Sequence, residues 1–337
     1  MSPVLQQWVG CSLGGLARKL TSDRARILMY HRFGRAGSYR RFDIEVFEAQ
    51  LRYIRDHFHP IQLSRIVESL QSGQSLPEKS VTLTVDDGYS DFIEYAYPLL
   101  LEYRIPATIF VVTHFIDQSL WLWFDAIHFL VHAAQRGSYY DAINSANGKE
   151  TFVQLSNDED RNCYWERVAD YCLGLSPQEC QKILRRLAAS LGQELPDKPT
   201  KDYSAMNWKE IRSLDPNLIE VGAHTRSHPI LSHCDDTLQR QEILGSRLDI
   251  EAKLGCPVRH FCYPNGLPRD YNGATLRLVQ EAGFMGAVVA HGTLVRKGAD
   301  LYLIERIGAP DDMREFKNVL NGLRDLKGQL FVRPMLK

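Results

Sequence analysis

The sequence contains no apolar run long enough to cross a membrane, no close cysteine pair and no excess of one charge. The longest apolar run, Ile105–Val112, is far shorter than the roughly 20 residues that a spanning helix needs. Forty Lys and Arg residues nearly balance 41 Asp and Glu residues, so no strong field attracts nucleic acid or an anionic membrane. We therefore exclude nucleic acid as a partner and expect no transmembrane segment.

Seven cysteines are scattered along the chain without a CxxC pair. This spacing predicts neither a disulfide framework nor a thiolate zinc site, and reduced thiols are typical of a cytoplasmic protein. The first residues also lack the basic segment and apolar core of a standard secretory signal. We therefore expect a cytoplasmic protein.

Residues 1–25 predict a helical extension. One face of this helix is apolar and consists of Leu5, Trp8, Val9, Leu16 and Leu20. The basic residues Arg18 and Lys19 lie near its end. Such a face packs on a domain more often than it lies in a membrane surface. We expect packing on the domain, with peripheral membrane contact as the alternative.

Short apolar runs rich in β-branched residues alternate with segments of helical period, which predicts an α/β fold with a parallel sheet. The expected strands are residues 26–30, 80–85, 107–112, 218–223, 258–263, 287–290 and 301–307. The expected helices are one that begins after Asp43 and those at 89–103, 237–254 and 274–282. About seven strand–helix units suit a complete or nearly complete barrel.

Residues 117–207 break this rhythm. Helical sequence at both ends of the stretch is joined by polar, turn-prone segments. We interpret it as a helical insertion on a barrel loop, in a position to form a lid over an active site. The barrel itself is expected to comprise residues 26–116 and 208–325.

Three short segments each follow a predicted strand, where barrel enzymes build their active sites. The first is Asp86-Asp87-Gly88, after the strand 80–85. Adjacent carboxylates leaving a strand point in different directions, so one can bind a cation while the other stays free as a base. Gly88 permits the sharp turn that this arrangement requires. Taken alone, such a segment is more often an acidic turn in solvent.

The second segment, after the strand 218–223, contains His224 and His228. Imidazoles at this spacing can bind one divalent ion, and one added carboxylate leaves a position open for water. Pro229 follows at once, which favours a tight turn over a long helix. An isolated pair of this kind is more often made of capping or core histidines.

The third segment is Tyr263-Pro264-Asn265-Gly266, at the end of the strand 258–263. A turn that contains Pro and Gly can hold a backbone N–H outward, where it could donate to a developing oxyanion. Taken alone, the segment predicts only a turn.

Together and in this order, the segments closely resemble motifs of the polysaccharide deacetylase (NodB-homology) family, of the carbohydrate esterase type. Residues 84–88 resemble its T-F-D-D-G motif, with Val85 in place of Phe. Residues 224–228 fit its H-[ST]-x-x-H motif, and residues 261–266 resemble its F-x-Y-P-x-G motif. The segment Met29-Tyr30-His31 also resembles the start of many members. The resemblance covers roughly residues 26–116 and 208–310.

The resemblance implies a deformed (β/α)7-8 TIM-like barrel that hydrolyses an acetyl group from a sugar. Asp86 would be the general base, and the metal ligands would be Asp87, His224 and His228. The ion, most simply Zn²⁺ with Co²⁺ or Ni²⁺ as alternatives, would polarise the acetyl carbonyl and lower the pKa of its water. A backbone N–H near Asn265 would help to stabilise the oxyanion. The substrate contacts would include Tyr263 and Pro264.

Some positions depart from the family pattern. Cys262 stands where many members carry an arginine that orients the base. Arg259 or Arg306 could take this role, and we favour Arg306 because it ends a predicted strand and resembles the arginine of an L-P-R-I segment. The family's Asp-Trp and Leu-x-His motifs have no match. The general acid is therefore unassigned, with His291 and His31 as candidates, although each is more often an ordinary strand-end histidine.

The leading hypothesis is deacetylation of an N- or O-acetylated glycan, or of its lipid-linked precursor, in exopolysaccharide synthesis. Deformylation or another amide hydrolysis on a lipid-linked amino sugar is an alternative, because the shape of the acyl pocket decides between the two. A catalytically silent member that binds glycan is less favoured, since buried carboxylates without a partner are costly. Trp121, Trp123 and Phe124 could stack on a sugar, although core packing is the commoner role.

Overall fold

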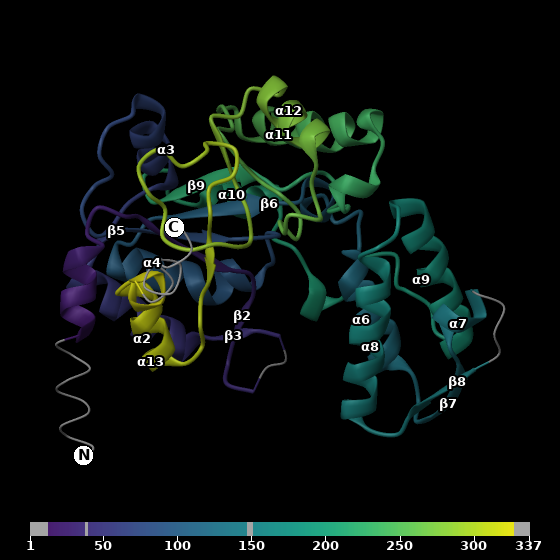
Figure 1. The fold of residues 1–337 in the computed structure, drawn as a ribbon. Helices are drawn as coiled ribbons and strands as arrows, with labels where there is room; N and C mark the ends of the chain where they lie inside the picture. Colours follow the sequence, from purple (N-terminus) through teal and green to yellow (C-terminus); the bar gives the residue numbers. More distant parts are fainter. Residues whose placement is uncertain (1–12, 38–39, 147–150, 327–337) are drawn as a thin grey trace, which may run out of the picture.

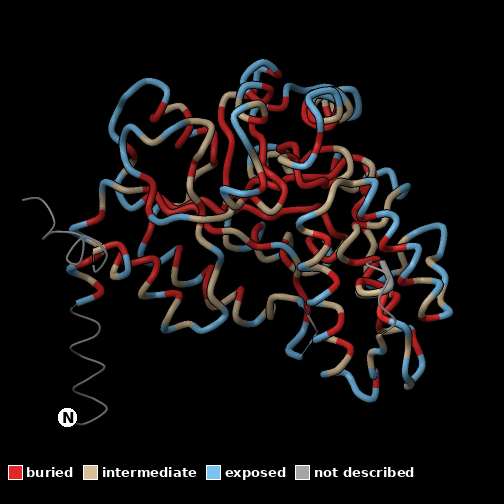
Figure 2. The backbone as a smooth tube through the Cα atoms, turned by 45° about the vertical axis from the view of Figure 1, so that its right-hand side comes forward, coloured by how far each residue is buried: buried red, intermediate tan, exposed pale blue. Residues whose placement is uncertain are grey.

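The computed structural model describes residues 13–37, 40–146 and 151–326. Its centre is an eight-stranded sheet in which every strand pair is parallel. In order across the sheet, its strands are β11 (Gly286–Val288), β10 (His260–Cys262), β9 (Ile219–Ala223), β6 (Ala107–Val111), β5 (Ser80–Val85), β1 (Arg26–Tyr30) and β12 (Ile307–Gly308), with β4 (His59–Pro60) paired to β5. These strands form most of the buried centre of the molecule (Figure 2).

The segment before β12 joins the two edges of the sheet. Ile304 forms a parallel bridge with Val288 at the end of β11, and Ile307 of β12 pairs with Leu28 of β1. The sheet therefore curves into the predicted deformed (β/α) barrel. The strand expected at residues 301–307 is wrong in extent, because only its last residue belongs to a strand.

Helices cover the outside of the sheet. They are α2 (Ile44–His57), α3 (Leu63–Ser72), α4 (Tyr97–Tyr103), α5 (Thr113–Ile116), α10 (Trp208–Ser213), α11 (Asp236–Leu254), α12 (Gly273–Glu281) and α13 (Met313–Leu320). In Figure 1, α11 and α12 lie on one side of the strands, and α2, α4 and α13 lie on the other. Helix α3 was not predicted from the sequence. The smaller elements are β2 (Phe33–Gly34), β3 (Phe42–Asp43), η2 (Lys201–Tyr203) and η3 (Leu231–His233).

Helix ends follow local signals in the sequence. Asp43 caps α2 as expected, because its side chain accepts a hydrogen bond from the backbone N–H of Glu45 at 2.9 Å. Gly255 ends α11 with a φ of 71°, a backbone conformation that glycine adopts readily. The helix expected at residues 89–103 is instead a π-helical turn, η1 (Phe92–Ala96), followed by α4.

Residues between α5 and α10 form a helical group beside the barrel, at the right of Figure 1. It contains α6 (Trp123–Ala133), β7 (Gly137–Tyr140), α7 (Ala142–Ala146), β8 (Phe152–Leu155), α8 (Asp158–Cys172) and α9 (Pro177–Leu191). Their apolar side chains bury one another in a cluster of their own. The hairpin β7–β8 was not predicted, and α8 begins where a turn-prone connection was expected. The boundaries at 117 and 207 stay a prediction.

Part of the expected N-terminal helix is described. Residues 13–20 are helical, and Ala17 is buried. Leu16 and Leu20, which were expected to pack on the domain, are 55% and 58% exposed. Leu5, Trp8 and Val9 lie outside the described residues. Within the described ranges, no helix has the length and apolar character needed to cross a membrane.

We predict that Gly88→Ala destabilises the fold more than Gly73→Ala. Both glycines have positive φ, 90° and 68°, but a Cβ at Gly88 would lie 2.8 Å from Ile116 Cδ1, whereas a Cβ at Gly73 would meet nothing within 4 Å. Backbone strain should cost about 1 kcal/mol at either site, and crowding at Gly88 about 1–3 kcal/mol more. Urea unfolding of both variants measures the difference. Equal losses would show that backbone strain alone decides the effect.

Candidate active site

The Asp86-Asp87-Gly88 turn directs two neighbouring carboxylates to different partners. It follows β5 directly, and Asp87 has a φ of 73°, a conformation that non-glycine residues seldom adopt. The backbone N–H of Gly88 donates to the carbonyl of Asp86 at 2.9 Å, which closes the turn. Both carboxylates are only 2% exposed. Such local strain is often retained at functional sites because the surrounding structure enforces it.

The histidine segment forms a tight turn after β9, as the sequence predicted. Thr225 and His228 have φ values of 66° and 57°. The backbone N–H of His228 donates to Thr225 Oγ1 at 3.0 Å. The N–H groups of Arg226 and Ser227 both donate to Glu242 Oε2 of α11, each at 2.8 Å. Helix α11 thereby fixes the turn that carries the two imidazoles.

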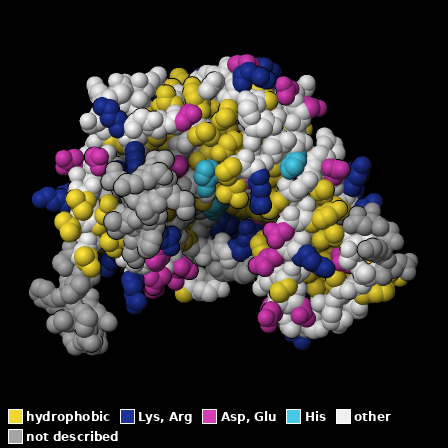
Figure 3. Space-filling view, in the orientation of Figure 1, with side chains coloured by type: hydrophobic (Ala, Val, Ile, Leu, Met, Phe, Trp, Pro, Cys, Tyr) yellow, Lys and Arg dark blue, Asp and Glu magenta, His cyan; other side chains and the backbone are white. Residues whose placement is uncertain are grey.

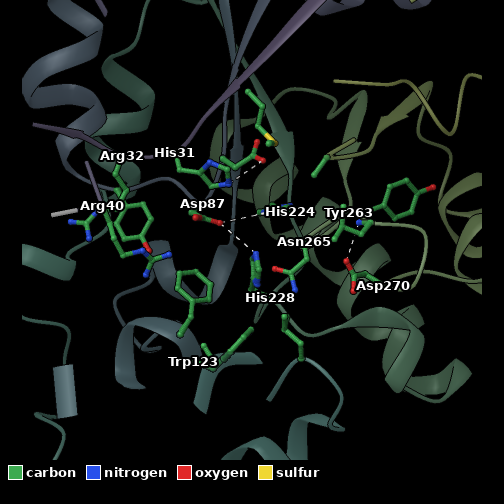
Figure 4. Close-up of a pocket in the computed structure, with 18 of the residues that line it drawn as sticks. His31, Arg32, Arg40, Asp87, Trp123, His224, His228, Tyr263, Asn265 and Asp270 are labelled. Atoms are coloured by element: carbon green, nitrogen blue, oxygen red, sulfur yellow. Dashed lines mark hydrogen bonds and ion pairs between the residues drawn. The ribbon is translucent and has the colours of Figure 1, made fainter. Parts of the chain in front are cut away.

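Asp87, His224 and His228 converge on one point (Figure 4). Asp87 Oδ1 lies 3.5 Å from His224 Nε2 and 3.6 Å from His228 Nε2. His224 Nδ1 lies 2.8 Å from the carbonyl oxygen of Cys262, so its Nε2 faces Asp87. Nδ1 therefore acts as the donor, which leaves Nε2 as a lone-pair ligand.

The chemistry of these three side chains fits a divalent cation. Asp87 Oδ1 is buried and has no hydrogen-bond partner among the described residues. Burial and the charge of Asp86 raise the pKa of Asp87 well above its ordinary value. Burial lowers the pKa of His224 to about 4 and that of His228 well below its ordinary value, so both imidazoles are neutral near pH 7. A bound cation would offset the free-energy cost of burying the ionised Asp87 carboxylate, and the two neutral imidazoles could bind it as well.

Asp86 has a different partner. Arg306 forms a bidentate ion pair with it, with Nη1–Oδ1 and Nη2–Oδ2 distances of 2.7 and 2.8 Å. Burial alone would raise the pKa of Asp86, but the charge and hydrogen bonds of Arg306 outweigh burial and hold it well below its ordinary value. Arg306 also donates to Cys262 Sγ at 3.1 Å. The structure therefore brings Arg306 to Asp86, whereas Arg259 is exposed.

The two candidates for the general acid differ in position. His31 lines the cavity over the site, with its Nε2 3.8 Å from Asp86 Oδ2 and its side chain 48% exposed. His291 Nε2 lies 3.2 Å from the hydroxyl of Tyr271, and His291 does not line this cavity. The structure thus brings His31, and not His291, to the other candidate residues.

The third segment supplies one wall of the cavity. Asn265 lines it in a left-handed conformation, with a φ of 54°, and its backbone N–H donates to no described residue. Tyr263 also lines it, and its hydroxyl donates to the carbonyl of Tyr302 at 3.0 Å. Pro264 is buried in the turn and is not part of the lining. Its predicted contact with substrate stays a prediction.

The cavity has a volume of about 620 Å³ and lies between the barrel and the helical group. The helical group contributes apolar side chains to its lining: Trp123, Phe124, Trp165, Ala169 and Leu173. The Phe124 ring packs edge-on against His228, with 5.4 Å between ring centres. Trp121 instead packs within the helical group, where its Nε1 donates to the carbonyl of Pro196 at 2.8 Å. Trp123 and Phe124 also pack against the hydrophobic cores, as expected, but unlike Trp121 they line the cavity as well.

Several residues of this lining were not predicted from the sequence, among them Arg32, Arg40, Trp165 and Asp270. Arg32 directly follows the His31 that the sequence analysis considered, which was the one local signal. Trp165 lies in the unpredicted α8, and Arg40 in a loop without a motif. No pattern in the sequence links these residues to the barrel site.

The fold and the site define a deformed (β/α) barrel with a candidate Asp-His-His metal centre at the carboxyl ends of its strands. The family model described as polysaccharide deacetylase matches residues 73–287. The chain belongs to the polysaccharide deacetylase family.

Two curated relatives match shorter stretches. The poly-β-1,6-N-acetyl-D-glucosamine N-deacetylase of Escherichia coli K12 is 35% identical over 69 residues, which are 20% of this chain and 10% of that protein. YxkH of Bacillus subtilis strain 168, whose name describes it as a polysaccharide deacetylase, is 34% identical over 87 residues. These residues are 26% of this chain and 31% of that protein. The match thus spans a tenth of one relative and under a third of the other.

Solved structures share the fold across most of the chain. The deacetylase PplD of Streptococcus pyogenes, in complex with acetate, has a TM-score of 0.57 and 18% identity, and the match covers 87% of this chain and 96% of that one. IcaB of Ammonifex degensii has a TM-score of 0.58 and 17% identity, with 89% and 97% covered. At this identity the likeness shows the fold alone.

We predict that Arg306→Met destabilises the protein by about 3–5 kcal/mol, because it leaves the buried Asp86 carboxylate without its partner. Adding Asp86→Asn should recover part of this loss. Urea unfolding of the two single variants and the double variant at pH 7 gives the coupling energy. Strictly additive losses would show that the pair is not coupled.

The pair also predicts a pH dependence of stability. Because the folded-state pKa of Asp86 is depressed, the contribution of the pair is present above the unfolded pKa of about 3.9 and is lost as the pH falls toward the folded value. In Arg306→Met, burial without the arginine raises the pKa of Asp86. The difference in stability between wild type and this variant should therefore be largest at high pH and shrink as the pH falls below that raised pKa.

Proposed function

We propose that the protein is a metal-dependent hydrolase that removes an acetyl group from an N- or O-acetylated sugar of a glycan or of its lipid-linked precursor. One observation carries the proposal: two adjacent buried carboxylates have separate partners, Arg306 for Asp86 and the two histidines for Asp87. A base and a cation ligand are thus held side by side. The family and the name of the Escherichia coli relative support an acetylated amino sugar as substrate.

Asp87, His224 and His228 would hold the cation, most simply Zn²⁺, with Co²⁺ or Ni²⁺ compatible with the same ligands. Such a cation polarises the acyl carbonyl and acidifies the attacking water, which suits a carboxylate base of low pKa. Arg306 keeps Asp86 deprotonated, so Asp86 is ready to accept the proton of the water. The backbone N–H of Asn265, at the wall of the cavity, is in place to donate to the developing oxyanion.

His31 is the side chain that we propose for the general acid. It shares the cavity with Asp86 and is half exposed, so it can reach both the leaving nitrogen and solvent. A leaving amine needs a proton as its bond to the acyl carbon breaks. His31 would deliver that proton, after which the free amine and acetate leave the cavity.

We predict metal-dependent acetate release from N-acetylglucosamine oligomers, with loss of activity in both Asp86→Asn and Asp87→Asn. The same metal should raise the melting temperature of wild type and of Asp86→Asn, but not that of Asp87→Asn, because only Asp87 is a proposed ligand. Asp270→Asn, which changes a buried carboxylate outside the ligand set, should keep the thermal shift.

The outcomes separate the alternatives. Metal binding without acetate release would favour formyl or another acyl group, to be tested with N-formylated and lipid-linked amino sugars. Metal binding with no hydrolysis of any of these substrates would favour a silent, glycan-binding member. Absence of any metal effect would contradict the proposal.

We predict that His31→Asn lowers kcat for the amide substrate by about 10²- to 10⁴-fold. The loss should be much smaller for 4-nitrophenyl acetate, because its leaving group departs without protonation. His291→Asn is the matched control and should change kcat by no more than a few fold. Steady-state kinetics on both substrates checks this prediction. Equal losses on amide and ester would contradict a role in protonating the leaving group.

A further inference from the structure

Arg40 lies at the edge of the active-site cavity, in the loop between β2 and β3. Its guanidinium carbon lies 4.5 Å from the ring centre of Trp165 and 5.7 Å from that of Phe124. These rings come from α8 and α6 of the helical group and hold the guanidinium by cation–π contact. In Figure 4, Arg40 lies on the opposite side of Asp87 from Tyr263. It thus lies across the site from the turn that carries Asn265.

The Arg40 guanidinium has hydrogen-bonding capacity to spare. Its nearest carboxylate is Asp125 Oδ1 at 3.8 Å, too far for a hydrogen bond. The other oxygen of Asp125 accepts a hydrogen bond from the Tyr89 hydroxyl at 2.5 Å. No hydrogen bond of Arg40 to a side chain or carbonyl of the described residues is present, and its side chain is 35% exposed.

The other arginines of the lining are more firmly engaged or more exposed. Arg306 is fully paired with Asp86, and Arg32 donates to Asp91 at 3.1 Å. Arg269 is 66% exposed and lies 3.7 Å from Asp270. Of these four arginines, only Arg40 both lies against aromatic rings and lacks a carboxylate within hydrogen-bonding distance.

The lining of the cavity carries a small excess of positive charge. Four arginines line it against three aspartates, and a cation held by Asp87 would add further positive charge. Figure 3 shows Lys or Arg and His side chains together in the hollow between the barrel and the helical group. A concave site with apolar walls concentrates such a field on its ligand. A neutral glycan makes no use of that field.

We propose that Arg40 binds an anionic group, a phosphate or a carboxylate, carried by the glycan close to the acylated sugar. This inference rests on the proposed function, because it assumes that the acylated sugar occupies this cavity. A planar guanidinium binds either group through two parallel hydrogen bonds. A phosphate would come from a sugar joined to a lipid carrier, and a carboxylate from a uronic acid within a polymer.

Calorimetric binding to the metal-loaded full chain tests the proposal without requiring turnover. The ligands are N-acetylglucosamine 1-phosphate, a disaccharide of glucuronic acid and N-acetylglucosamine, and the neutral methyl glycoside of N-acetylglucosamine. We expect one of the anionic ligands to bind about 10- to 100-fold more tightly than the neutral glycoside. Preference for the first ligand identifies a phosphate as the anion, and preference for the second a carboxylate.

Variants assign the preference to Arg40. Arg40→Gln should abolish it while leaving the affinity for the neutral glycoside unchanged, and Arg40→Lys should restore part of it. Arg35→Gln, an equal charge change at an exposed position of the same loop, should keep the preference in full. High salt should weaken anion binding in wild type more than in Arg40→Gln.

Three results would overturn the inference. They are equal affinity for charged and neutral ligands in wild type, an undiminished preference for the anionic ligand in Arg40→Gln, and a loss of affinity for the neutral glycoside as well in that variant. The second result would assign the anion to the metal, and the third would make Arg40 a support of the site. Anion binding without acyl hydrolysis would contradict the proposed function alone. Hydrolysis without a charge preference would contradict this inference alone.

Discussion

The ion pair between Asp86 and Arg306 is the interaction on which the rest of the site depends. It joins the end of β5 to the segment that links the two edges of the barrel. Because Arg306 takes one carboxylate of an adjacent pair, the other is left to face the histidines. The charge of Asp86 still raises the pKa of Asp87, but the separate partners give the two carboxylates different roles.

Burial gives these charges their strength. Arg306 and both aspartates are at most 2% exposed, so their interactions are screened little by water. The cost of burying Asp86 is offset within the chain, because Arg306 is part of the fold. The cost of burying Asp87 is not offset by any cation of the described residues in contact with it. One carboxylate is therefore matched by the protein, and the other would be matched by the cation of the proposed metal site.

Local patterns in the sequence predicted the elements that position this site. The strands at Arg26–Tyr30 and Ser80–Val85 have the predicted bounds, because both are short apolar runs in the barrel core. Arg306 was placed beside the base from its motif, although its strand is shorter than expected. Arg40 and Trp165 could not be predicted, because tertiary packing alone brings a loop and an inserted helix to the cavity. Sequence periodicity reports burial within an element, not the partner that covers it.

The helical group changes what the barrel site can accept. Phe124 packs on His228, and Asp125, the next residue, accepts a hydrogen bond from Tyr89, which follows the Gly88 turn. Two neighbouring residues of α6 thus contact both segments that carry the proposed metal ligands. The cavity over Asp87 is lined both by this helix and by the turn at Asn265. The group is therefore a wall of the active site rather than an appendage, and differences among substrates should depend on its side chains as much as on the barrel's.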